Sequence, residues 1–180
     1  GTLDMKKCVI VLVVLMAVLT SAFAATSSAV QVESNDTQSI NVTCPISENI
    51  PKFQLVACTT SNGTYGGSDL TYSNDAVLDT AGITAYFKVK YEGTDTSKAI
   101  RWDHSVTVTA EATDLKGANN ASSTIAKTVS SVTGGNKSFK SGIGKTGEFA
   151  SFNVNWKTST PDDLPADSYS ATVTVTFTVN

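Results

Sequence analysis

Apolar and hydroxyl side chains alternate along the last stretch of the sequence, SYSATVTVTFTVN, which runs from Ser168 to Asn180. An alternation with a period of two puts one set of side chains on each face of a β-strand. The apolar set is Tyr169, Ala171, Val173, Val175, Phe177 and Val179. The pattern therefore predicts one long terminal strand with an apolar face and a hydroxyl-rich face.

The same period recurs through the middle of the chain. Residues 53–57, 83–91, 100–110 and 152–156 each place apolar side chains on one face, and loops rich in Gly, Ser, Asn and Asp separate them. The polar stretch EGTDTSK predicts a hairpin between the second and third of these strands. The apolar residues of 125–132 are spaced as on a helix, so we expect a loop there with one helical turn.

Composition agrees with a sheet protein of one domain. The chain has 180 residues, of which 41% are hydrophobic and 16% are charged, and this size suits a single domain. Ser and Thr make up roughly a quarter of the chain, a bias that favours strands. About seven short strands separated by turns predict an antiparallel β-sandwich of the immunoglobulin-like type.

The N-terminal residues predict a secretory signal peptide. Lys6 and Lys7 precede the apolar run CVIVLVVLMAVLTSAFA, which ends in the small-residue pattern of a cleavage site. We expect residues 1–24 to comprise an upstream extension and the signal peptide, with export beginning at Ala25. The alternative is an uncleaved membrane anchor, because the run approaches the length of a spanning helix.

The charge of the exported chain excludes one class of partner. Cleavage removes Asp4, Lys6 and Lys7 and leaves 11 basic and 15 acidic side chains, a net charge of −4. No basic patch is then available to displace counterions from phosphates. We therefore expect no nucleic acid partner.

Two cysteines, Cys44 and Cys58, remain after export. In an exported protein the simplest expectation is one disulfide between them. Closing this loop would stabilise the fold by about 3 kcal/mol in the chain-entropy model. A metal site would need more ligands than two thiols and the single histidine, His104, supply.

No motif predicts an enzyme. GIGKTG at residues 142–147 contains the GKT of a phosphate-binding loop, but Phe139 stands where that loop needs its first Gly, and a strand pattern follows. LDTAG at residues 78–82 occurs once, whereas aspartic protease chemistry needs two converging carboxylates. No GxSxG elbow accompanies the one histidine. We expect no catalytic, metal or cofactor-binding residues and no cofactor.

An open sheet edge presents unpaired backbone groups to other chains, so a terminal strand this apolar on one face needs a cover. In its ends the chain resembles the pilins of chaperone–usher fimbriae, including the spore-coat-protein-U-like and colonisation-factor-like branches. Pilins begin with a signal peptide and an alternating extension and end on PAG-x-Y-x-x-x-V-x-V-x-x, to which PADSYSATVTVTFTVN is similar. Asp167-Ser168 replaces the usual Gly before the aromatic residue, and Val179 replaces the common penultimate Tyr.

The resemblance implies an incomplete sandwich over residues 44–180 that a donated strand completes. A periplasmic chaperone would lend that strand during export, and the N-terminal extension of the next subunit, residues 25–43, would replace it in the fibre. Val30 and Val32 are the expected donor side chains, and the terminal strand is expected to line the acceptor groove.

The implied function is that of a structural subunit of an extracellular fimbria at the cell surface. The subunit would be exported through the periplasm, pass an outer-membrane usher and polymerise head to tail with copies of itself. Adhesion or biofilm formation is the implied role.

Two other functions remain open from the sequence. One is a surface or matrix fibre protein that exchanges strands without a chaperone and usher. The other is a monomeric exported module that binds carbohydrate or acts as an adhesin, with Trp102, Trp156 and Tyr65 as candidate stacking residues. A host or surface ligand is a further partner that the sequence leaves open.

Overall fold

The structure is a computed structural model that describes residues 42–140 and 142–180. The chain divides into two compact units, residues 1–47 and 48–180. Residues 42–47 of the first unit form no regular secondary structure and are exposed. The expected signal peptide and most of the expected donor segment lie outside the described residues.

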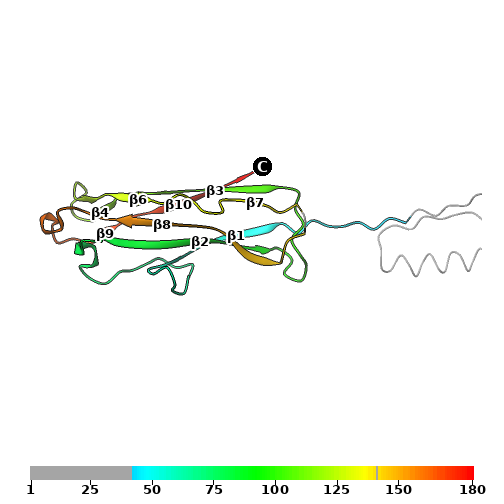
Figure 1. Ribbon diagram of the computed structural model, residues 1–180, viewed down its shortest axis with the longest axis horizontal. Helices are drawn as coiled ribbons and strands as arrows, with labels where there is room; N and C mark the ends of the chain where they lie inside the picture. The colour runs from blue at the N-terminus through cyan, green and yellow to red at the C-terminus, as the bar shows by residue number, and fades with distance from the viewer. Residues whose placement is uncertain (1–41, 141) are drawn as a thin grey trace, which may run out of the picture. The chain divides into compact units, whose positions relative to one another are not determined.

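The second unit is built from β-strands (Figure 1). Its elements in chain order are β1 (Pro51–Cys58), η1 (Ala76–Leu78), β2 (Ile83–Gly93), β3 (Ser105–Ala112), β4 (Leu115–Gly117), β5 (Thr124–Ile125), β6 (Lys127–Val129), β7 (Asn136–Ser138), β8 (Thr146–Trp156), η2 (Pro161–Asp163), β9 (Tyr169–Ser170) and β10 (Val173–Val179). Over the described ranges there is no α-helix, and no helix is long and apolar enough to cross a membrane. For the described part of the chain, the expectation of an all-β fold is confirmed.

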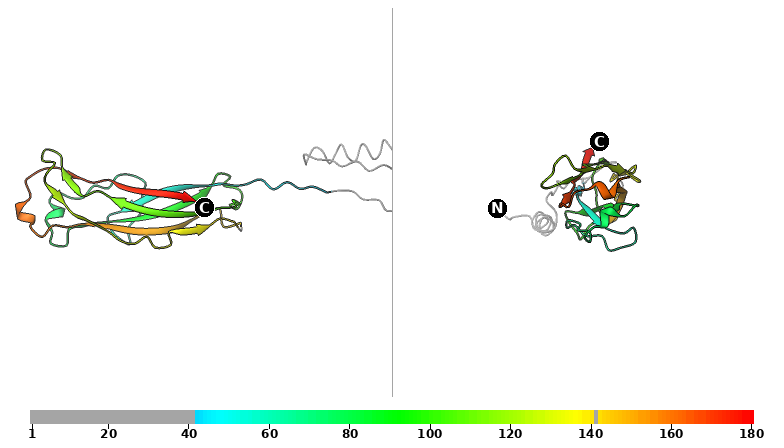
Figure 2. Two further views of the ribbon diagram at one scale, coloured as in Figure 1. Left: turned by 90° about the horizontal axis from the view of Figure 1, so that it is seen from above. Right: turned by 90° about the vertical axis from the view of Figure 1, so that its left-hand side faces the viewer.

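The strands form three antiparallel sheets, with the orders β1-β2-β8-β6, β10-β3-β7 and β5-β4-β9. The first two sheets supply side chains to one core cluster, in which Val89 and Tyr91 of β2 and Ala150 of β8 meet Val106 and Val108 of β3. Figure 2 shows β10 at the margin of its sheet, alongside β3. A second core cluster joins Phe87 of β2 and Phe152 of β8 to Leu115 of β4 and Ile125 of β5, so all three sheets contribute to the core.

The longest strands follow the predicted alternation. β2 and β8 lie side by side in the middle of the four-stranded sheet, and their register places Phe87 opposite Phe152 with ring centroids 4.9 Å apart. Both rings are buried, while the polar residues that alternate with them along each strand face outward. Burial of one face and solvation of the other explains why a period of two predicts these strands so well.

The predicted hairpin between residues 83–91 and 100–110 is wrong. β2 pairs with β1 and β8, whereas β3 pairs with β10 and β7. The backbone of Arg101 pairs instead with Asn49, directly before β1. This contact holds the loop after β2 at the end of the four-stranded sheet, so the chain crosses to the other sheet before β3 begins.

The helical turn expected within residues 125–132 is not formed. β5 and β6 are extended and pair with β4 and β8, and Val129 of β6 lies opposite Val154 of β8. The helix-like spacing of the apolar residues arises because Ile125 and Val129 belong to two different short strands. Their β-branched side chains fit this extended conformation.

The terminal strand predicted as one element is divided into β9 and β10. Tyr169 lies on β9 opposite Gly117 of β4, in the third sheet. The break falls at Thr172, whose backbone exchanges hydrogen bonds with the backbone and side chain of Thr113. Only the residues from Val173 onward form the edge strand, β10.

The predicted disulfide is absent, because both cysteines have free thiols. Cys44 is exposed, and Cys58 is buried at the end of β1. A bridge between them would need residues 45–50 to fold back along residues 51–58, which form one uninterrupted strand ending in Cys58. Backbone hydrogen bonding from Thr60 lowers the pKa of the Cys58 thiol.

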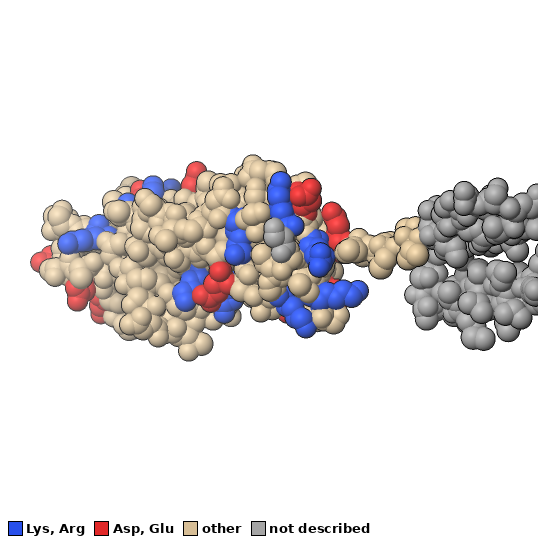
Figure 3. Space-filling view, turned by 45° about the vertical axis from the view of Figure 1, so that its right-hand side comes forward, with Lys and Arg blue, Asp and Glu red and all other residues tan. Residues whose placement is uncertain are grey.

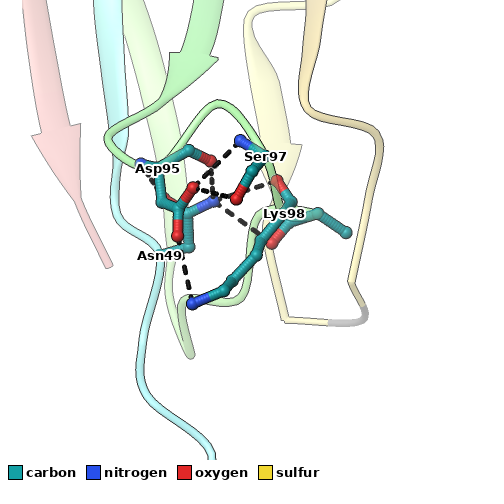
Figure 4. A network of polar contacts seen from close by, with 5 residues as sticks. Asn49, Asp95, Ser97 and Lys98 are labelled. Atoms are coloured by element: carbon teal, nitrogen blue, oxygen red, sulfur yellow. Dashed lines mark hydrogen bonds and ion pairs between the residues drawn. The ribbon is translucent and has the colours of Figure 1, made fainter.

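A buried asparagine fastens the start of the second unit to the loop after β2 (Figure 4). Asn49 is 4% exposed, and its Nδ2 donates to the carbonyl oxygens of Asp95, Lys98 and Ala99 at 2.8, 3.1 and 3.3 Å. Its Oδ1 accepts from the Asp95 backbone N–H at 2.8 Å. The amide thus satisfies backbone groups that the loop would otherwise bury without partners.

The same loop contains a carboxylate with a low pKa. The side chain and backbone N–H of Ser97, together with Lys98, lower the pKa of Asp95 from 3.8 to about 2. A carboxyl whose pKa is lower in the folded chain stabilises the fold above its unfolded pKa. The contribution of Asp95 is therefore complete above about pH 4 and is lost as the pH falls through about 2.

Asn49→Ala is expected to lower the free energy of unfolding by roughly 2 kcal/mol, because several partly buried backbone groups lose their partner at once. Gly93 leaves room for this amide, since a Cβ there would lie 2.6 Å from Asn49 Nδ2. Urea denaturation measures the change. Asn136→Ala, at an exposed position of β7, is the control and should shift stability by less than about 0.5 kcal/mol. Equal effects of the two substitutions would contradict this role of Asn49.

Candidate functional site

β10 is an edge strand with a partner on one side only. It pairs with β3 over its whole length, from Val173 opposite Ala112 to Val179 opposite Val106. Within the described ranges no strand lies along its other side. An edge of this length is a template for pairing with another strand.

The second half of the apolar row of β10 is exposed although it faces the core side. Val179 is 52% exposed, whereas Val106, directly opposite on β3, is 0% exposed. Phe177 is 36% exposed, whereas its opposite residue, Val108, is 4% exposed. Paired residues point to the same face of a sheet, so orientation does not explain the difference. What exposes the β10 residues is the open space beside their strand.

The backbone groups of the same residues point to the open side. Ser105 and Asn180 exchange both backbone hydrogen bonds, at 3.0 and 2.9 Å. Bonded and non-bonded pairs alternate along an antiparallel ladder, so the threonines of β10 bond to β3. The N–H and C=O groups of Val175, Phe177 and Val179 therefore face away from β3. An additional strand along this edge would cover the exposed apolar side chains and would also bond the free backbone groups.

β1 presents a second open edge next to β10. At the end of β1 the backbone of Ala57 bonds with Gly66 on the side away from β2, so the backbone groups of Phe53 and Leu55 also face that side. Phe53 stacks on Phe177 of β10, with ring centroids 5.1 Å apart and an interplanar angle of 17°. This stacking joins the two open edges across the core.

We call these joined edges the open seam. It consists of the half-buried residues of β1 and the half-buried or exposed residues of β10 that face the core: Phe53, Leu55, Val175, Phe177 and Val179. Gly66 closes the β1 side of the seam beyond Leu55. The open part therefore runs from there to the end at which β1 begins.

The chemistry of the open seam is that of binding. Its five side chains are apolar, and none can ionise or act as a nucleophile. The groups with shifted pKa values lie elsewhere; Tyr72, for example, has its pKa raised to about 12, chiefly by burial. In the described part of the chain no group of three or more His, Cys, Asp or Glu side chains is placed to hold a metal ion. The seam can bury an apolar strand.

The structure brings four of the six predicted terminal-strand residues to one edge. Val173, Val175, Phe177 and Val179 lie on β10. Tyr169 and Ala171 do not, because they precede the break, and Tyr169 lies on β9 in the third sheet. The predicted donor residues, Val30 and Val32, lie outside the described residues.

Sequence reasoning missed the contribution of β1 to this site. The alternation of Phe53 and Leu55 identifies their shared face, but it does not show that β1 is an edge strand. Their contact with β10 joins segments more than a hundred positions apart in the chain. Only the pairing of all the strands reveals it.

The three candidate stacking residues do not form a common surface. Trp156 is buried at the end of β8, with its Nε1 donating to the Thr113 carbonyl at 2.9 Å. Trp102 is half-buried before β3 and packs on exposed His104 at 4.8 Å between ring centroids. Tyr65 is half-buried, and Lys88 Nζ lies 4.5 Å from its ring centroid. The geometry of these residues does not favour a carbohydrate platform.

Comparison with known proteins adds no relative. The chain matches no family model, and a search of curated proteins finds no match. The open seam is therefore the feature of the described chain from which a function is inferred.

Proposed function

We propose that this chain is a structural subunit of an extracellular fimbria that polymerises head to tail by donor-strand exchange. The observation that carries the proposal is the difference in exposure between opposite residues of β10 and β3. Phe177 and Val179 have an apolar partner strand on one side and open space on the other. A strand from a second copy would cover their side chains and pair with their backbone groups.

The strand order supports an immunoglobulin-like sandwich in which the described residues supply no last strand. In such a sandwich one sheet has the order A-B-E-D and the other has G-F-C. β1, β2, β8 and β6 correspond to A, B, E and D, while β10 and β3 correspond to F and C. Strand G would lie along the open side of β10. The proposed donor thus takes the place of a strand that the order itself leaves vacant.

A tyrosine at the start of β9, Tyr169, supports the same fold. Tyr169 follows the β8–β9 connection, and its hydroxyl donates to the Pro165 carbonyl four residues upstream at 3.1 Å. A tyrosine that bonds back to the preceding backbone at the corner between strands E and F is a hallmark of immunoglobulin-like sandwiches. Ser123 also bonds this hydroxyl, at 2.7 Å.

The proposed donor is the N-terminal extension, residues 25–43, with Val30 and Val32 facing the seam of the neighbouring copy. Burying two valines contributes about 3–6 kcal/mol as an upper bound. Hydrogen bonds to the free edge of β10 add roughly 1 kcal/mol each. The backbone ladder therefore supplies a large part of the binding free energy.

The resemblance to chaperone–usher pilins supplies the remaining parts of the proposal. A periplasmic chaperone would cover the seam before assembly, because an apolar edge of this kind invites wrong pairing. An outer-membrane usher would then receive the subunit, and the fibre would serve adhesion or biofilm formation at the cell surface. A fibre that assembles without chaperone and usher would use the same seam.

Negative-stain microscopy of the exported chain tests the proposal directly. We expect fibres whose growth consumes monomers. A chain that stays monomeric and resists unfolding without any added strand has a complete fold of its own, and that outcome would refute strand exchange.

A further inference from the structure

Charged residues gather at the end of the second unit where the chain joins it (Figure 3). β1 begins there, with Pro51 opposite Gly93 of β2, and β8 begins beside the end of β2. The segments at this end, residues 48–54, 90–104 and 136–148, carry seven Lys or Arg and five Asp or Glu side chains. We call it the basic end, because its net charge is +2.

The opposite end has the opposite excess. Its segments are residues 73–84, 111–127 and 157–170, which the contact between η1 and η2 and the pairing of β4 with β9 hold there. They carry three Lys and seven Asp or Glu side chains, a net charge of −4. We call it the acidic end.

Several of these charges have no internal partner. Lys52 and Lys145 at the basic end are exposed and take part in no ion pair within the described residues. The same holds for Asp162 and Asp163 of η2 and for Glu111 of β3 at the acidic end. These side chains are therefore available to a second molecule.

We propose that the acidic end of one copy docks on the basic end of the next copy, and this inference rests on the proposed head-to-tail fibre. The extension joins its own subunit at the basic end, where β1 begins. In a head-to-tail row the basic end of each subunit therefore faces the acidic end of the subunit that receives its extension. Opposite charges meet at every junction, whereas a head-to-head contact would place cations together.

The contact guides assembly more than it holds the fibre together. Exposed ion pairs contribute little individually to binding. Complementary electrostatic potentials on the two ends nevertheless raise the association rate, and salt weakens this effect. The donated strand in the open seam holds the subunits once they have met. The charged ends set how fast, and in which orientation, they meet.

Paired charge reversals on the exported chain test this contact. The first variant, Glu111→Lys with Asp162→Lys and Asp163→Lys, makes both ends basic. The second, Lys52→Glu with Lys145→Glu, makes both ends acidic. Each variant alone should elongate roughly 10-fold more slowly than the original chain at low salt. An equimolar mixture should recover most of the original rate, because copies of the two variants that alternate along the fibre join opposite charges at every junction.

Controls separate charge from folding and from strand exchange. Glu111→Asp with Asp162→Glu and Asp163→Glu keeps every charge and should assemble at the original rate. If a reversed variant fails to fold, salt dependence of the unaltered chain decides: raising NaCl from about 0.01 M to about 0.15 M shortens the screening length from about 30 to about 8 Å and should slow elongation.

The outcomes distinguish this inference from the proposed function. Fibres that need the extension but grow at the same rate in both salt concentrations would overturn the contact between the ends and leave strand exchange intact. Reversed variants that assemble normally alone, or a mixture that does not recover, would overturn it as well. An unaltered chain that stays monomeric under all these conditions would overturn both.

Discussion

Val179→Asp is expected to abolish fibre formation while leaving the subunit folded. Val179 is half exposed at the open seam, so a carboxylate there stays solvated in the free subunit. A donated strand would bury it without a partner, at a cost of at least about 3 kcal/mol, or roughly a 100-fold loss of strand affinity. Fibre yield by sedimentation and subunit stability by urea denaturation measure the two effects separately.

Val106→Asp is the matched control, because Val106 lies directly opposite Val179 on the same face and is fully buried. There the carboxylate enters the core of the subunit itself, so the expected result is loss of the folded subunit. The same substitution by Asp thus distinguishes a residue of the open seam, Val179, from a residue of the subunit's own core, Val106. If Val179→Asp also unfolds the chain, or if it forms fibres normally, the open seam is not the acceptor site.

Deletion of residues 25–37 is expected to stop fibre formation and leave a subunit that can still accept a strand. In the proposed fibre this segment completes the neighbouring copy and contributes nothing to its own core. A synthetic peptide of residues 25–43 should then bind the deleted subunit. At 100 times its dissociation constant it would stabilise the subunit by about 2.7 kcal/mol, which thermal unfolding detects as a rise of about 5–10 °C.

The same peptide with Val30→Asp is the control for side-chain recognition. It should bind at least about 100-fold more weakly, because its carboxylate would face the apolar seam. The full chain carrying Val30→Asp should likewise fail to form fibres. Normal fibres from the deleted chain would show that another segment, or no segment, completes the fold.

The sequence alone was enough to predict the longest strands, β1, β2, β3, β8 and β10, but not the short ones between them. In β2 and β8 one face is buried and the other is solvated, so the apolar residues recur at every second position. Pairing was harder, because the pattern within one strand says nothing about its neighbour. The loop of residues 94–99 looks like a hairpin turn, yet its bonds to Asn49 carry the chain to the other sheet. Long-range contacts of this kind have no local signal.

For the candidate site, the alternation of residues is enough to predict the apolar face of the last strand, from Val173 to Val179. That this face is only half covered follows from the packing of the sheets. Val106 and Val179 are both valines in an alternating pattern, but Val106 lies on the middle strand of its sheet and Val179 lies on the edge strand. The exposure of a residue depends on how many strands lie beside its own strand. That number is set by the spatial order of the strands in the sheet.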